Sequence, residues 1–384
     1  MAEHITRNDG VVGSIPTTSS SSPQAVACGE FFLLSDTLLV LPPHLQSLAV
    51  LPAWLCFGAK LKPGTAWGVD FLSLDLQTVF LNLLELFLLI GAGYGVVRWG
   101  ALPASASSAF SGLLMNVTLP ATILTSLVRP YDPAFIRDGI LTAVLGAVLI
   151  LGYGLFCIPA LRLFRVPEGR RGAWILCCTF CNNGFMGFPI TLALFGEEGL
   201  ALAVFLAIPF NLLIYTAGPK LVCLDRSSSG DMQSLPWGAI LFTATNLATL
   251  LGILLYALQI PLPAVLAAPL NYLSDITTPL SMVVIGMNLV GQRLSGILRD
   301  RDVLSASLLR LLVLPVLTWV LLVLLPISNP LVVGVIVIIM AMPCAAVTSI
   351  LAESYGGNTE FPSKSVFLSS LFCLVTIPLI SLLL

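Results

Sequence analysis

Ten apolar segments follow one another from Leu74 to the C-terminus, and they restrict the fold more than any other feature of the sequence. Each is close to the roughly 20 residues that an α-helix needs to cross the hydrocarbon core of a bilayer. Charged residues make up only 9% of the chain, against about a quarter in soluble domains. The sequence therefore predicts an all-α integral membrane protein with ten transmembrane helices. Their approximate limits are 75–98, 106–128, 136–161, 172–195, 200–224, 236–258, 266–291, 303–325, 330–352 and 363–384.

Residues 1–70 differ from the rest of the chain. Ser14–Pro23 is rich in serine, threonine and proline without hydrophobic periodicity, which is typical of disorder. Phe31–Phe57 is apolar, but prolines and a histidine interrupt it, which favours an interfacial segment over a span or a signal peptide. The first methionine after Met1 is Met115, so a later start at another codon is a hypothesis. We expect a disordered or interfacial extension whose presence in the native protein is open.

Two of the ten segments contain residues that break helices. The fourth contains Asn182–Pro189, with the sequence NNGFMGFP, and the ninth contains Met342, Pro343 and Cys344. Proline removes a backbone donor and clashes with the preceding turn, and each glycine costs roughly 1 kcal/mol of helix propensity. Broken backbone at membrane depth persists only where it is buried in protein or lines a wet cavity. One such motif alone is also typical of a kinked helix packed through its glycines. Two in corresponding places of two half-chains indicate the binding site of a secondary transporter.

The basic residues divide unequally between the two sets of loops. Loops after the odd-numbered segments hold most of them, including the four arginines between Arg162 and Arg171, whereas loops after the even-numbered segments hold only Arg129 and Arg137. Basic loops stay in the cytoplasm. This predicts a multi-pass protein of the plasma membrane with the first residue of its membrane core and its C-terminus outside.

Ten segments divide into two sets of five. Because five is odd, two homologous units would enter the membrane from opposite sides as inverted repeats. We expect a first repeat at 75–224, a cytoplasmic loop at 225–235 and a second repeat at 236–384. Asn116–Pro120 in the second segment and Asp275–Pro279 in the seventh support this division, because each places a polar residue four positions before a proline.

The interruptions predict how a ligand is bound. A broken helix leaves a half-helix N-terminus whose free N–H groups and partial positive charge attract an anion. Two such termini facing one site would bind a small organic anion without a basic side chain. The carboxamides of Asn182 and Asn183 are expected to contact the substrate, the alternative being that they satisfy backbone groups freed by the break. The predicted substrate-binding residues are Asn116, Asn182, Asn183, Gly184, Gly187, Pro189, Pro343 and Cys344.

Two carboxylates lie well inside apolar segments, where a charge is costly. Asp275 in the seventh segment is the candidate site for a coupling ion, H⁺ or Na⁺. The alternatives are a carboxyl bound to backbone opened by the nearby Pro279 and a carboxyl that lies closer to the membrane surface. Glu85 in the first segment is expected to be structural. Gly91 and Gly95 are expected to pack that segment against another helix.

The remaining polar residues of the segments predict no chemistry of their own. Arg310 and Glu353 lie near segment ends and are expected to extend towards the membrane surface. Asn211 and Asn246 are expected to satisfy backbone groups.

Composition excludes several functions. The cysteines nearest to one another, Cys177, Cys178 and Cys181, have no histidine near them, which predicts ordinary buried thiols and no metal or cofactor. No His-Glu-x-x-His motif and no paired aspartates occur in the segments, so an enzyme is not predicted. The net charge of −2 argues against nucleic acid as a partner.

Four motifs resemble those of the auxin efflux carrier family, which includes the plant PIN-type carriers and bacterial malate and malonate permeases. They are Asn116–Ala121, Asn182–Pro189, Thr278–Met282, and Met342-Pro343 followed by Leu351–Gly356, and the resemblance covers about residues 75–384. It implies the ten-helix fold shared with bile-acid symporters and sodium–proton antiporters, with segments 1, 2, 6 and 7 as a scaffold and the others as a transport domain. Helices 4 and 9 would cross at the substrate, and the transport domain would move like an elevator. A homodimer through the scaffold helices is left open.

Departures from the family pattern narrow the range of expected substrates. The loop Ser227–Ser234 is short, unlike that of many plant carriers, which favours a prokaryotic protein in a bacterial inner membrane. Segment 3 lacks an aspartate–lysine pair, and Thr348 stands where many relatives have a second proline. We therefore expect a dicarboxylate such as malate rather than auxin. A cation/proton antiporter or a bile-acid-type symporter on the same fold, a channel and a non-transporting sensor remain alternatives.

Overall fold

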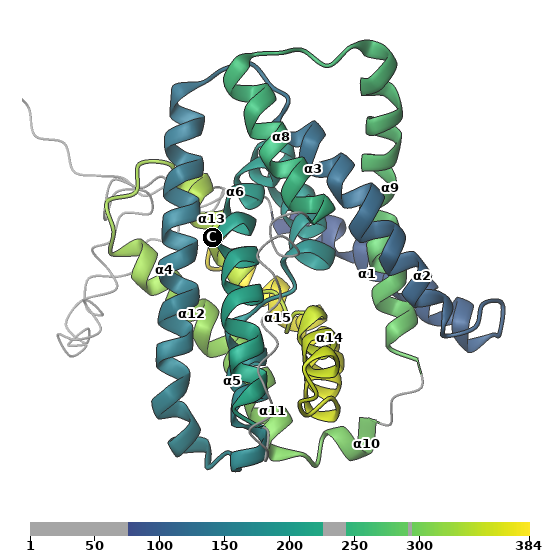
Figure 1. Cartoon of the computed structure of the whole chain (residues 1–384), viewed down its shortest axis with the longest axis vertical. Coiled ribbons are helices and arrows are strands. Elements are labelled where there is room, and N and C mark those ends of the chain that lie inside the picture. Colours follow the sequence, from purple (N-terminus) through teal and green to yellow (C-terminus); the bar gives the residue numbers. More distant parts are fainter. Residues whose placement is uncertain (1–75, 226–242, 291–293) are drawn as a thin grey trace, which may run out of the picture. The chain divides into compact units, whose positions relative to one another are not determined.

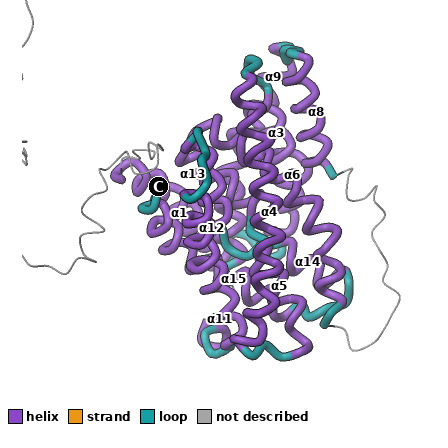
Figure 2. The backbone as a smooth tube through the Cα atoms, turned by 90° about the vertical axis from the view of Figure 1, so that its left-hand side faces the viewer, coloured by secondary structure: helices purple, strands orange, loops and turns teal. Residues whose placement is uncertain are grey.

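The computed structural model describes residues 76–225, 243–290 and 294–384, without the side chains of 76–79, 294 and 295. Every described residue belongs to one compact unit of the chain. The predicted extension at 1–70 lies outside the described residues, as does the predicted loop at 225–235 apart from Asp225. Every regular element in the described ranges is a helix, as Figure 2 shows.

Most of the described helices lie along the predicted apolar segments (Figure 1). In the first half they are α1 (Leu76–Arg98), α2 (Ala106–Leu113), η3 (Leu114–Thr118), α3 (Leu119–Leu127), α4 (Pro133–Phe164), η4 (Glu168–Arg170), α5 (Arg171–Thr179), η5 (Asn183–Gly187) and α6 (Phe188–Cys223). In the second half they are α8 (Ala244–Leu258), α9 (Ala264–Asn288), α10 (Leu294–Ile297), α11 (Arg301–Leu308), η6 (Leu309–Val313), α12 (Leu314–Val323), α13 (Pro330–Met340), α14 (Val347–Ser354) and α15 (Glu360–Ser381).

Length and hydropathy support a membrane protein. Among the described residues, six helices are long and apolar enough to cross a membrane, and α8 and α13 are shorter apolar helices. The six are Phe80–Arg98, Ala106–Leu127, Pro133–Phe164, Asn183–Cys223, Arg301–Val323 and Glu360–Ser381. The helix Phe188–Cys223 contains the boundary between predicted segments 4 and 5, because Gly196 leaves the helical conformation with a φ of 65°. That backbone conformation suits glycine alone.

Three wide π-helical turns share one cause. The turns η3, η5 and η6 each end two residues before a proline, namely Pro120, Pro189 and Pro315. Proline donates no backbone hydrogen bond, and its ring clashes with the carbonyl four residues earlier, so the turn before it widens. Two of these prolines belong to the motifs singled out in the sequence.

Glycines let pairs of helices approach closely. The helices α1 and α9 pack together at Gly93 and Gly286, where an added Cβ would overlap the backbone carbonyl oxygens of Val283 and Ile90. The prediction that the first segment packs against another helix is confirmed, but Gly91 and Gly95 do not make the contact. A Cβ on Gly91 would have nothing within 4 Å, and one on Gly95 would face the Trp99 ring. Gly93, which lies between these two glycines, is on the face of α1 that contacts α9.

The second and seventh predicted segments meet through hydroxyl groups. Thr122 Oγ1 in α3 donates a 2.8 Å hydrogen bond to Thr277 Oγ1 in α9, and both residues are buried. The side chains of Thr125 and Ser274 are joined at 3.4 Å. These residues flank or belong to the two polar–proline motifs, so the motifs lie beside each other.

Candidate functional site

The two interruptions predicted from the sequence are present, and they pair with each other. Between α5 and η5, and between α13 and α14, the chain leaves the helical conformation. The Asn182 N–H donates to the Pro343 carbonyl at 2.8 Å, and the Ala345 N–H donates to the Phe180 carbonyl at 3.0 Å. Cys181 therefore lies opposite Cys344 in a short antiparallel bridge. We call residues 180–182 and 341–346 the crossing. It satisfies backbone groups that the broken helices can no longer pair.

Side chains complete the hydrogen bonding of the crossing. The Asn182 side-chain oxygen accepts from the Phe185 N–H at 3.3 Å, which caps the half-helix that follows. The Ser369 hydroxyl in α15 accepts from the Cys344 N–H at 3.0 Å. The Asn182 oxygen therefore serves the backbone, as the alternative interpretation of the carboxamides expected. Asn183 differs, because its side-chain oxygen is buried and has no hydrogen-bond partner.

A cavity of about 100 Å³ adjoins the crossing. Its wall is mainly apolar, with carboxamide and hydroxyl groups at a few points. The lining residues are Met115, Leu119, Ile123, Cys181, Asn182, Asn183, Gly184, Phe185, Phe188, Ala207, Phe210, Asn211, Ile214, Tyr215, Thr245, Ala345, Ala346, Val347 and Ile350. Because this lining includes the first residues of η5 and α14, two half-helix N-termini border the cavity. No lining residue is an Asp, Glu, Lys or Arg.

The structure brings together most of the predicted substrate-binding residues. Asn182, Asn183 and Gly184 line the cavity. Gly187, Pro189, Pro343 and Cys344 are buried, and the last two belong to the crossing. A Cβ on Gly187 would lie 2.8 Å from the Ile339 side chain, so this glycine lets η5 approach α13.

Three other polar residues lie outside the cavity wall. The Asn116 side chain is exposed and donates to the Gly112 carbonyl of its own helix at 2.9 Å. Asp275 in α9 and Glu85 in α1 are also exposed.

Arg310 contradicts its prediction. Instead of extending towards the membrane surface, it is fully buried in η6. Its Nε donates to the Met342 carbonyl at 3.0 Å and its Nη1 to the Cys178 carbonyl at 3.3 Å, so it contacts both interrupted helices. The prediction failed because distance from a segment end says nothing about what packs around a side chain. The available signal was a single arginine inside the apolar run from Leu308 to Val313.

Two further cavity residues were missed or misjudged. The Asn211 side chain in α6 donates a 2.8 Å hydrogen bond to the Asn246 side chain in α8, rather than serving the backbone as predicted. Tyr215, one turn after Asn211 on the same helix, also lines the cavity. The signal for both was the four-residue spacing that places them on one helix face.

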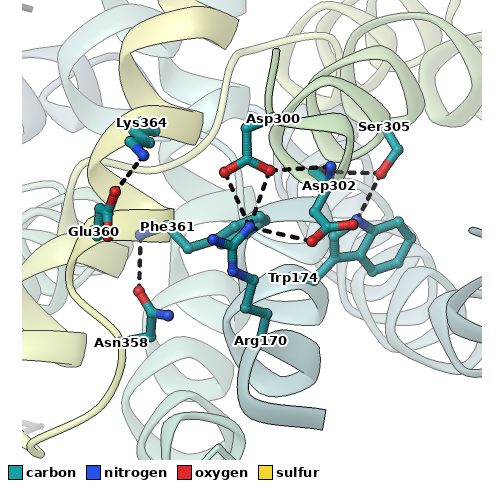
Figure 3. Close-up of polar contacts among 9 residues, drawn as sticks. All are labelled: Arg170, Trp174, Asp300, Asp302, Ser305, Asn358, Glu360, Phe361 and Lys364. Carbon is teal, nitrogen blue, oxygen red and sulfur yellow. Dashed lines mark hydrogen bonds and ion pairs between the residues drawn. The ribbon is translucent and has the colours of Figure 1, made fainter. Parts of the chain in front are cut away.

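A separate cluster joins the starts of α5, α11 and α15 (Figure 3), where the Arg170 guanidinium lies over the Phe361 ring of α15, with 5.9 Å between Cζ and the ring centroid. Arg170 Nη1 lies 2.9 Å from Asp300 and 3.2 Å from Asp302. The Trp174 indole N–H donates to the Ser305 hydroxyl at 3.0 Å. Since α5 leads into the crossing and α15 supplies Ser369, this cluster fixes helices on which the crossing depends.

Comparison with known proteins assigns the family. The profile of the family described as membrane transport protein matches residues 78–234 and 232–381. An uncharacterized transporter of Methanothermobacter thermautotrophicus is 28% identical over 79% of this chain and 97% of its own length. An uncharacterized transporter of Methanocaldococcus jannaschii is 26% identical over 77% of this chain and 96% of its own length. A proposed malonate transporter of Rhizobium meliloti is 25% identical over 77% of this chain and 92% of its own length.

Proposed function

Because this chain belongs to the membrane transport protein family, as its motifs predicted, we propose that it is a secondary transporter of a small organic anion with its binding site at the crossing. The observation that carries the proposal is the convergence of two half-helix N-termini and Asn182 and Asn183 on one cavity. N–H groups at helix N-termini bind carboxylates without a basic side chain. The unpartnered oxygen of Asn183 offers an acceptor to a hydroxyl or a protonated group of the substrate.

Alternating access would use two inverted repeats of five helices each. Two pairs of contacts support this arrangement, because exchanging the two repeats converts one contact of each pair into the other. The first segment packs on the seventh (α1 on α9), and the sixth packs on the second (α8 on α3). At the start of the third segment, Asp138 accepts from Asn329 at the start of the ninth at 2.7 Å. At the start of the eighth, Asp300 and Asp302 bind Arg170 at the start of the fourth.

We propose the elevator arrangement that the family resemblance implies. The helices α1, α2–α3, α8 and α9 would form the scaffold, and α4–α6 with α11–α15 would move. Pro189, Pro343, Cys344, Gly184 and Gly187 would shape the moving site. Asn116 and Asp275 would contact the substrate or a coupling ion, H⁺ or Na⁺, only in another position of the transport domain, because neither lines the cavity.

The substrate class follows from the cavity and from one relative. The small volume suits a compact acid, and a relative bears the name of a proposed malonate transporter. We propose a short dicarboxylate such as malonate or malate. The proposed setting is a bacterial inner membrane, with the C-terminus outside and a homodimer through the scaffold helices.

Counterflow tests the proposal. Protein reconstituted in liposomes is loaded with unlabelled malonate, and uptake of labelled malonate is followed against protein-free liposomes. A carrier should show saturable uptake that internal malonate stimulates. Uptake that rises linearly with concentration and ignores internal malonate would favour the channel. The absence of binding and uptake across a panel of small organic acids would contradict the proposed function.

A further inference from the structure

Arg310 does not line the cavity, although it lies fully buried against the crossing. Besides its two backbone acceptors, it lies over the Tyr153 ring, with 5.6 Å between Cζ and the ring centroid. Its Nη2 is buried without a hydrogen-bond partner. Among the described residues, no carboxylate lies within ion-pair distance of it. Burying a cation without an opposite charge costs free energy, so we expect other groups to compensate the charge of Arg310 or the charge to serve a function.

The two acceptors of Arg310 identify the charge that it meets. The Cys178 carbonyl belongs to the last turn of α5, and the Met342 carbonyl lies two residues beyond the end of α13. Each carbonyl lies at the C-terminal end of a half-helix, where the helix dipole places about −0.5 of an elementary charge. A single guanidinium of charge +1 therefore offsets both ends.

The opposite ends of the breaks border the cavity. The half-helices beginning at Asn183 and Val347 each present about +0.5 of an elementary charge to it. Without a cation, two positive and two negative ends lie around the same crossing and largely cancel. With Arg310 against the negative ends, the positive ends act on the cavity unopposed.

Arg310 is close enough for its charge to reach the site. Its two acceptors, Cys178 and Met342, each precede a residue of the cavity wall by three positions, namely Cys181 and Ala345. The charge therefore lies against the two chain segments that lead into the cavity wall, and it is buried in surroundings of low dielectric.

We propose that Arg310 is a positioning residue that makes the crossing selective for anions, by neutralising the two half-helix C-termini without touching the substrate. This inference rests on the proposed function and deepens it. It assigns the preference for a negatively charged substrate to a residue outside the cavity.

The test compares ligands of equal shape and different charge. Binding of malonate and of its uncharged analogue malonamide is measured on purified wild-type protein and on Arg310→Gln and Arg310→Lys. Glutamine keeps a donor for the carbonyls but no charge. We expect Arg310→Gln to bind malonate about tenfold more weakly, with malonamide binding unchanged, and Arg310→Lys to keep the preference near pH 7.

The lysine variant adds a second measurement, the pH dependence of the preference for malonate. This dependence would not change if Arg310 had only a structural role. A buried lysine loses its proton more easily than an exposed one, whereas arginine stays charged. The malonate preference of Arg310→Lys should therefore fall between about pH 7 and pH 9 while that of the wild type stays level, since carboxylates remain ionised throughout. The titratable groups around this position are the same in both proteins, and they are Tyr153, Cys157, Cys177, Cys178, Cys181 and Cys344.

Each outcome decides the inference. An Arg310→Gln protein that keeps its malonate affinity, or loses both ligands equally, overturns the role in selectivity. If that variant does not fold, a level pH profile of Arg310→Lys overturns it. A wild-type protein that binds neither malonate nor any other organic acid contradicts the proposed function itself, which separates the two failures.

Discussion

The side chain of Asn211 in α6 donates a 2.8 Å hydrogen bond to the side chain of Asn246 in α8 at the edge of the cavity. In the proposed elevator, α6 moves and α8 does not, so this bond must break in each cycle. A double-mutant cycle of Asn211→Ala and Asn246→Ala, read out by thermal unfolding in detergent, should give a coupling of about 0.5–1.5 kcal/mol. If the movement of the transport domain limits the rate of substrate exchange, the same variants should exchange substrate faster than the wild type, because this bond no longer has to break. Additive effects on stability would show that the bond contributes nothing.

Asn182 is predicted to serve both the backbone and the substrate. Asn182→Ala should abolish uptake while the protein still inserts and folds. Asn182→Asp is the matched control, since it keeps an acceptor for the Phe185 N–H but adds a negative charge at the cavity. It should preserve stability and still lose malonate binding. Uptake kinetics of Asn182→Ala equal to those of the wild type would remove this residue from the site.

The close contact of α1 with α9 depends on glycine at defined positions. Gly286→Ala should destabilise the protein by about 1–3 kcal/mol, because the new methyl group meets the Ile90 carbonyl and the backbone must shift. Gly91→Ala is the matched control on α1, with open space at the added methyl group. It should be neutral or slightly stabilising. Equal melting temperatures for the two variants would contradict the packing described.

Asp225 should give a pH-dependent contribution to stability. Its carboxylate accepts from the Gly172 and Ala173 N–H groups at 2.8 Å each, at the start of α5. Burial raises the pKa of Asp225 above its ordinary value, and the backbone hydrogen bonds oppose this only in part. A raised carboxyl pKa means that the folded state binds the proton more tightly than the unfolded state.

The sign of that effect can be checked against a variant that does not titrate. The stability of wild type relative to Asp225→Asn should be greatest at acid pH, and it should fall as pH rises from about 4 through the raised pKa. Melting temperatures of both proteins over about pH 4–7 give the comparison. A difference that grows in favour of wild type with rising pH would contradict the prediction.

Asp275 tests the proposed coupling to an ion. It is exposed on α9, outside the cavity wall. If it binds H⁺ or Na⁺ during the cycle, Asp275→Asn should change the dependence of uptake on pH or on sodium concentration. Uptake measured over a grid of both conditions provides the check. A profile identical to that of the wild type would assign Asp275 to structure alone.

The sequence by itself determined where helices run and where they break. Apolar length is a local property, and most of the described helices lie along the predicted apolar segments. Proline and glycine also act on their own turn, so the interruptions at Asn182 and Pro343 and the wide turns before Pro120 and Pro189 could be anticipated. The family could be predicted because its motifs consist of these same helix-breaking residues.

Only the tertiary structure decided which surfaces meet. Hydropathy does not distinguish Gly93 from Gly91, yet only Gly93 meets the backbone of α9, because the rotation of a helix about its axis is set by its neighbours. From the sequence alone, Arg310 is a residue near the end of an apolar segment. In the fold, it binds carbonyls of two half-helices that are far apart in the sequence. The pairing of Cys181 with Cys344 joins residues from opposite halves of the chain, and no local rule encodes it. Local chemistry specified the broken helices, and long-range packing made a cavity of them.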